Sequence, residues 1–108
     1  MSRFEQYGLQ PSEVHAAQPT GGFIILDVRE PFELQICSVA GAVHIPMSVL
    51  PDRLHELDQK TPIACLCHHG VRSHRVAMWL RAQGYETYNI EGGIDAWAHD
   101  LDPEMVRY

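Results

Sequence analysis

Short apolar runs that end in charged or turn-forming residues recur along the chain. Residues 23–28 and 62–67 are almost continuously apolar, which is typical of strands covered on both faces of a parallel sheet. Residues 42–45, stopped by Pro46, and residues 86–90 predict two further short strands. The pattern therefore predicts a sheet whose strands are mostly buried.

Helical spacing of apolar residues fills the segments between these runs. It predicts helices over residues 11–18, 51–57, 73–83 and 94–99 and a short helical start over residues 30–35. Gly84 is expected to cap the helix over residues 73–83. Trp79 and Trp97 are expected on helix faces that pack into the hydrophobic core. Strands alternating with helices predict an α/β domain with a mostly parallel sheet of about five short strands and helices on both faces.

Length and composition favour one globular domain over residues 1–108. The chain is 45% hydrophobic and 20% charged, which is ordinary for a globular protein. No apolar run approaches the roughly 20 residues that a membrane helix needs. Residues 1–10 mix charged with single apolar residues and contain no apolar stretch of a secretory signal. We therefore expect a cytoplasmic protein without a membrane partner.

The net charge of −6 is spread unevenly. It makes nucleic acid an unfavourable general partner. Residues 60–85 nevertheless contain no acid and four basic residues, which are Lys60, Arg72, Arg75 and Arg81. This basic window contains two of the three cysteines, although chance clustering on a helix face would also explain it.

The three cysteines are Cys37, Cys65 and Cys67. An odd count without a secretory signal argues against a disulfide framework. Cys65 is expected in the core beneath Cys67, since residues two apart in a strand point to the same side. The Cys-x-Cys-His-His spacing matches no common zinc site, so no metal is expected.

The segment with the clearest chemistry joins a buried strand to a helix. The strand delivers Cys67 at its carboxyl end, a short loop with Gly70 follows, and a helix is expected from Ser73. Sites in open α/β sheets lie at the carboxyl ends of strands, and a helix N-terminus offers free N–H groups and positive charge. Such a loop favours a thiolate nucleophile beneath an anion pocket.

Three side chains of this loop have two interpretations each. His68 and His69 either line the pocket or are solvated loop residues, and we favour pocket lining. Arg72 stands at the start of a helix, where the dipole disfavours a cation, so an anionic substrate or a carboxylate partner must compensate. We favour substrate binding for Arg72.

The size of the loop separates two possible chemistries. An anion-binding thiolate could attack phosphorus, or it could attack a sulfane sulfur and hold a persulfide. Cys67 and Arg72 have the spacing Cys-x4-Arg, whereas cysteine phosphatases of this design need Cys-x5-Arg to cradle a tetrahedral phosphate. The smaller ring suits one additional sulfur atom on the cysteine.

Four segments, in order, resemble the signatures of the single-domain rhodanese family of sulfurtransferases. They are residues 26–33 (LDVREPFE), 41–46 (GAVHIP), 67–73 (CHHGVRS) and 92–97 (GGIDAW). The resemblance covers residues 9–98 and implies one rhodanese-like domain. The sequence departs from the family pattern just before the second signature. Ser38 occupies a position at which many relatives carry a histidine.

The resemblance implies a mechanism and a set of site residues. The Cys67 thiolate would take sulfur from a small anionic donor, thiosulfate or a polysulfide, and pass it to cyanide or a thiol, including a protein thiol. The backbone of His68, His69, Gly70, Val71, Arg72 and Ser73 would bind the persulfide and substrate. Asp27 and Arg29 would form a structural ion pair or hydrogen-bond cluster near the site. No cofactor is implied.

Several questions stay open at this point. A partner-dependent persulfide carrier or regulatory module, without activity on free thiosulfate, would show the same motifs. A compact domain of this size fits a monomer or a weak dimer. The roles of Cys65 and Cys37 are undetermined.

Overall fold

The computed structural model describes residues 7–108. Residues 1–6, part of the segment in which no secretory signal is expected, lie outside the described residues. Five parallel strands form one sheet in the order β1-β5-β4-β2-β3. The strands are β1 (Gly8–Leu9), β2 (Ile24–Asp27), β3 (Val43–His44), β4 (Ile63–Leu66) and β5 (Thr87–Ile90). The predicted parallel sheet is confirmed, and β1 is an addition because two residues are too short for a periodic signal.

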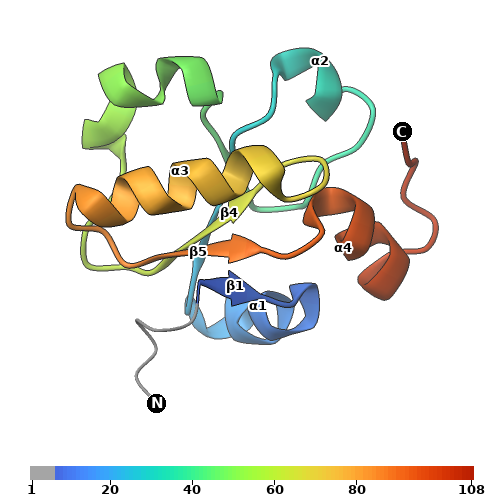
Figure 1. Cartoon of the computed structure of the whole chain (residues 1–108). Helices are drawn as coiled ribbons and strands as arrows, with labels where there is room; N and C mark the ends of the chain where they lie inside the picture. The colour runs from blue at the N-terminus through green and yellow to red at the C-terminus, as the bar shows by residue number, and fades with distance from the viewer. Residues whose placement is uncertain (1–6) are drawn as a thin grey trace.

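Helices cover the sheet on both faces, as predicted (Figure 1). The helical elements are α1 (Pro11–Ala17), η2 (Gln18–Thr20), α2 (Pro31–Leu34), η3 (Met47–Glu56), α3 (Val71–Ala82) and α4 (Gly93–Leu101). The helix expected over residues 51–57 is instead the 3₁₀ segment η3, which begins at Met47. Pro51 lies inside it and has no N–H for the α-helical hydrogen bond.

Alternate residues of the central strand β4 point into two separate cores. Ile63 and Cys65 belong to the core beneath α3 and η3, which also contains Cys67. Ala64 and Leu66 belong to the core beneath α1 and α4. All five side chains are buried, so the strand that carries Cys67 is held from both faces of the sheet.

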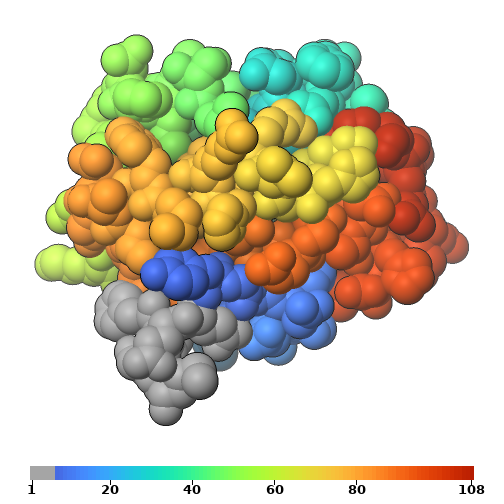
Figure 2. All heavy atoms as spheres, viewed as in Figure 1, coloured from blue at the N-terminus to red at the C-terminus, as the bar shows by residue number. Residues whose placement is uncertain are grey.

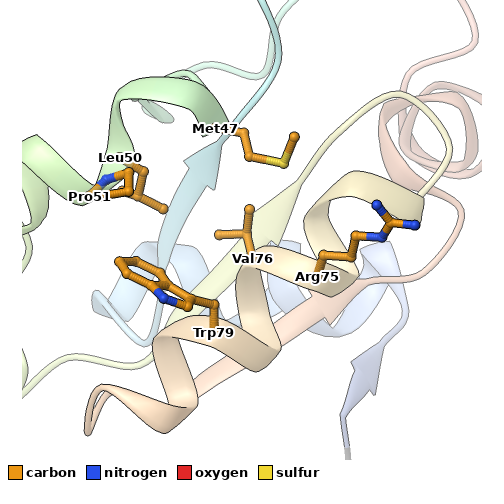
Figure 3. A pocket seen from close by; sticks show the side chains of 6 residues that line it. All are labelled: Met47, Leu50, Pro51, Arg75, Val76 and Trp79. Carbon is orange, nitrogen blue, oxygen red and sulfur yellow. The ribbon is translucent and has the colours of Figure 1, made fainter.

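One core prediction is wrong. Trp97 is buried, but Trp79 is 37% exposed and lines an apolar groove of about 260 Å³ between η3 and α3. Figure 3 shows the Trp79 indole facing Leu50 and Pro51 across this groove. The wide face of α3 is covered only in part by the narrow η3 segment, so the large indole reaches solvent.

No helix within residues 7–108 is both long enough and apolar enough to span a lipid bilayer.

Candidate active site

Cys67 lies directly after β4, at the carboxyl edge of the sheet, and is 1% exposed. Its Sγ accepts a hydrogen bond from the backbone N–H of Gly70 at 3.1 Å and another from the Ser73 hydroxyl at 3.2 Å. Gly70 is the N-cap of α3, with a φ of 96° that an L side chain rarely adopts. The helix begins at Val71, two residues earlier than predicted. Ser73 therefore stands in its first turn, and its hydroxyl faces the sulfur.

Backbone N–H groups at the start of α4 fix the orientation of the loop by binding two of its carbonyls. The N–H of Ile94 donates to the carbonyl of Cys67 at 2.8 Å, and the N–H of Asp95 donates to the carbonyl of His68 at 3.2 Å. A Cβ on Gly93 would lie 2.5 Å from the His68 oxygen and 2.6 Å from the Cys67 oxygen. The loop carbonyls thus point toward α4, and Gly70 can turn its N–H toward the sulfur.

Asn89, near the end of β5, completes a ring of hydrogen bonds that connects Gly70, the Cys67 sulfur and Ser73. Its amide N–H donates to the Gly70 carbonyl at 3.0 Å, and its Oδ1 accepts a short hydrogen bond from Ser73. Both Asn89 and Ser73 are buried. The single Ser73 proton can be donated either to Cys67 or to Asn89, so the serine is held in place whichever acceptor it serves.

Arg72 has a carboxylate partner on α2. Its guanidinium donates two hydrogen bonds to Glu33, both of 2.8 Å, and Glu33 is 4% exposed. These bonds, followed by one from the backbone N–H of Glu30, lower the pKa of Glu33 from 4.5 to about 2. The same pair raises the pKa of Arg72. A carboxylate partner, one of the two explanations expected for a cation at this helix start, is therefore present. Substrate binding by Arg72 stays a prediction.

The expected ion pair between Asp27 and Arg29 is present beneath the site. Arg29 Nη2 lies 2.7 Å from Asp27 Oδ2, and both side chains are almost fully buried. Arg29 also donates to the carbonyl of Cys37 at 2.9 Å, and its own carbonyl accepts from the His44 ring at 2.7 Å. This cluster joins the end of β2 to the segment that follows α2.

The remaining loop side chains differ in their exposure. His68 is partly buried, whereas His69 and Val71 are exposed. The His68 and His69 rings are stacked, with centroids 3.8 Å apart. His69, Gly70, Val71 and the exposed Arg75 line a hollow of about 370 Å³ beside the loop. Of the two histidines, only His69 borders this hollow, whereas His68 is stacked on Tyr108, and pocket lining by the pair stays a prediction.

Cys65 is fully buried, as expected, and burial raises the pKa of its thiol. A thiol that stays protonated is a poor nucleophile, so Cys65 is a core residue beneath Cys67. Cys37 is partly buried and, like the other two cysteines, is a free thiol. Among residues 7–108, no group of three or more histidine, cysteine or acidic side chains is placed to hold a metal ion.

Comparison with known proteins identifies the family. A family model described as a rhodanese-like domain matches residues 10–100. The chain belongs to this family. The match extends from just before α1 into the last turn of α4, so it includes the Cys67 loop and the helices α2 and α3 beside it.

Named relatives and solved structures agree with this assignment. Thiosulfate sulfurtransferase GlpE of Tolumonas auensis is 32% identical over 100 residues, covering 92% of each chain. GlpE of Stutzerimonas stutzeri is 32% identical over 98 residues, covering 90% of this chain and 89% of the relative. A rhodanese-related protein from Thermoplasma volcanium superimposes with a TM-score of 0.82 at 30% identity, covering 88% of this chain and 93% of that structure.

The sequence interpretation missed three residues of the site. Glu33 lies inside a recognised signature, but nothing in the sequence pairs it with Arg72, which is 39 residues away. Asn89 could have been suspected, because a polar residue at the end of a buried strand needs a partner. Tyr108 is stacked on His68, with ring centroids 3.7 Å apart, and it lies outside the region of the family resemblance.

Proposed function

We propose that this protein is a rhodanese-type sulfurtransferase that carries sulfane sulfur as a persulfide on Cys67. The observation that carries the proposal is the environment of the Cys67 sulfur, which two hydrogen-bond donors of the α3 start face at 3.1 and 3.2 Å. Donors already in place where negative charge resides stabilise a thiolate and, later, a persulfide anion. The names of the GlpE relatives supply the donor class, thiosulfate.

In the first half-reaction the Cys67 thiolate attacks the outer sulfur of thiosulfate. A bond forms between Sγ and that sulfur, the sulfur–sulfur bond of thiosulfate breaks, and its electron pair leaves on sulfite. The Gly70 N–H and the Ser73 hydroxyl face the Sγ end of this persulfide, and the outer sulfur carries its negative charge. The buried position of Cys67 limits access of bulky reagents and favours a small donor such as thiosulfate or a polysulfide.

In the second half-reaction a nucleophilic acceptor attacks the outer sulfur of the persulfide. Cyanide or a thiol, including one on a protein, forms the new bond to sulfur, and the electron pair of the Sγ–S bond returns to Cys67 as the thiolate. No net oxidation occurs, because sulfane sulfur is only moved. This proposal retains the cytoplasmic location expected from the sequence, where thiols are kept reduced and can serve as acceptors.

The basic groups around the loop favour approach of an anion to an acidic protein. Arg75 is exposed beside the hollow at the loop, whereas the charge of Arg72 is balanced by Glu33. The same hollow is also lined by Glu91, so on a protein of net charge −6 Arg75 offsets local negative charge and eases the approach of an anionic donor.

Steady-state transfer of sulfur from thiosulfate to cyanide, followed as thiocyanate, tests the proposal. Two half-reactions that share a covalent intermediate predict parallel double-reciprocal lines. Cys67→Ser should abolish turnover, and the control Cys37→Ser, which removes another free thiol, should retain it. Turnover by Cys67→Ser would contradict the proposal. A wild-type protein that takes up sulfur but forms no thiocyanate would favour the partner-dependent carrier.

A further inference from the structure

The segment after α4 turns back across the active-site loop. Its middle is anchored by Met105, which packs against the core beneath α1 and α4. Arg107 then forms an ion pair of 2.8 Å with Asp95 at the start of α4. Figure 2 shows these last residues, in red, beside the yellow residues of the loop and near the cyan residues of α2. These two anchors therefore hold Tyr108, the next residue, in a defined position.

Tyr108 holds the beginning of the loop through its ring and backbone. Its ring lies parallel to that of His68, with centroids 3.7 Å apart and planes 8° apart. His68 Nε2 donates to the Tyr108 backbone oxygen at 2.6 Å. Two contacts thus restrain the residue that directly follows Cys67.

The Tyr108 hydroxyl links two ion pairs that would otherwise be separate. It accepts a hydrogen bond of 2.9 Å from Arg29 and donates one of 2.8 Å to Glu33. Arg29 is paired with Asp27 in the scaffold, and Glu33 is paired with Arg72 in the loop. Burial, together with the bond donated to Glu33, raises the pKa of Tyr108 to about 12, so its hydroxyl keeps the proton it donates.

One side chain therefore contacts the restraints on both ends of the loop, His68 at one end and Arg72, through Glu33, at the other. Tyr108 is itself 36% exposed and belongs to neither hydrophobic core. Its loss should disturb the loop and also remove one hydrogen bond each from the buried Arg29 and Glu33, so stability has to be measured beside sulfur transfer.

We propose that Tyr108 is a positioning residue of the sulfur-transfer site, which fixes both ends of the Cys67 loop from the C-terminal segment. The inference rests on the proposed function, because the loop matters for transfer only if Cys67 is the nucleophile. Tyr108 acts through His68 and Glu33 and does not touch Cys67 in the structure.

The test compares Tyr108→Phe and Tyr108→Ala with the control Tyr85→Phe. Tyr85 donates its hydroxyl proton to the Leu54 carbonyl at 3.3 Å, beyond the C-terminal end of α3 and therefore at the opposite end of that helix from the loop. Removing the Tyr108 hydroxyl should raise KM for thiosulfate about fivefold, the net value of one hydrogen bond, with kcat within about twofold. Removing the whole side chain should lower kcat/KM by more than about tenfold, because the ring contact to His68 is lost as well.

A second readout needs no sulfur donor. The rate at which iodoacetamide alkylates Cys67, measured by peptide mass spectrometry across pH, reports the state of the thiol in the loop. Tyr108→Ala should shift this pH profile, Tyr108→Phe should retain part of the wild-type profile, and Tyr85→Phe should match wild type. Thermal midpoints should stay within a few degrees of wild type for all three variants.

The two readouts separate failure of this inference from failure of the proposed function. If wild type forms no thiocyanate while Tyr108→Ala still shifts the alkylation profile, the donor assignment fails and the positioning role stands. If Tyr108→Ala alkylates and transfers sulfur like wild type, the positioning role is overturned. The role is also overturned if all changes follow the loss of folded protein alone.

Discussion

The hydroxyl of Ser73 lies 3.2 Å from the sulfur of Cys67, and both residues are almost fully buried. Ser73 stands in the first turn of α3, so its hydroxyl and the Gly70 N–H reach the sulfur from the same helix start. A buried anion needs such partners, since desolvation otherwise favours the protonated thiol. The proposed sulfur-carrier role of Cys67 therefore depends on Ser73 and Gly70, which predicts an effect of changing Ser73.

Replacing Ser73 with alanine should slow sulfur transfer by about tenfold or more, because one donor facing the charged sulfur is lost. Asn89 would also lose its hydrogen-bond donor. The rate at which iodoacetamide alkylates Cys67 should change, since one hydrogen-bond donor to its sulfur is removed. The exposed Ser38 provides the control, and Ser38→Ala should leave both quantities unchanged. An unchanged rate of Cys67 alkylation in Ser73→Ala would show that the hydroxyl does not affect the sulfur.

Glu33→Gln should destabilise the protein and impair transfer together. It leaves Arg72, whose side chain is 33% exposed, without its carboxylate, and losing one partner of this partly buried pair costs about 2 kcal/mol. Urea unfolding and kcat/KM measure the two effects. Glu56→Gln is a matched control, because Glu56 binds Arg53 through two similar hydrogen bonds on the exposed surface. That change should leave the free energy of unfolding almost unchanged, because the pair is solvent-exposed, and equal losses in the two variants would contradict the account.

The same carboxylate predicts a defined dependence of stability on pH. The pKa of Glu33 is about 2 in the folded protein against an ordinary value of 4.5, so folding favours its ionised form. Its contribution, on the order of 3 kcal/mol, is complete above pH 4.5 and is lost as the pH falls toward 2. Urea midpoints of wild type and Glu33→Gln should therefore converge between pH 4.5 and 2. A constant difference over that interval would show that the pair does not lower this pKa.

Gly93→Ala should disrupt the loop directly. The added Cβ would meet the carbonyl oxygens of His68 and Cys67 at 2.5 and 2.6 Å, and we expect a loss of about 3 kcal/mol with loss of transfer. Gly21 has a similar positive φ but no atom near a built Cβ. Gly21→Ala should therefore cost only about 1 kcal/mol for backbone strain. Equal costs at the two positions would mean that the close approach of α4 to the loop is unimportant.

The sequence predicts the order of elements and the position of Cys67 at the end of a buried strand because those features are local. The runs at residues 23–28 and 62–67 are the buried strands β2 and β4, and Gly84 takes a positive φ just after α3. The 3₁₀ character of η3 was missed because apolar spacing alone does not separate the two helix types. Pro51 was the available signal.

The supports of the site could not be read from the sequence because they are non-local. Glu33 and Arg72 are brought together from α2 and α3, which follow the neighbouring strands β2 and β4. Ile94 and Asp95 hold loop carbonyls through backbone N–H groups, which carry no side-chain signal. Tyr108 follows α4 in an irregular segment, where no periodicity marks its position.

Intact-protein mass spectrometry after incubation with thiosulfate tests the central claim most directly. Wild type and Cys37→Ser should each gain about 32 Da, one sulfur atom, and dithiothreitol should remove it. Cys67→Ser should gain nothing. A gain on Cys67→Ser, or no gain on wild type with either thiosulfate or a polysulfide as donor, would contradict the assignment of Cys67 as the sulfur carrier.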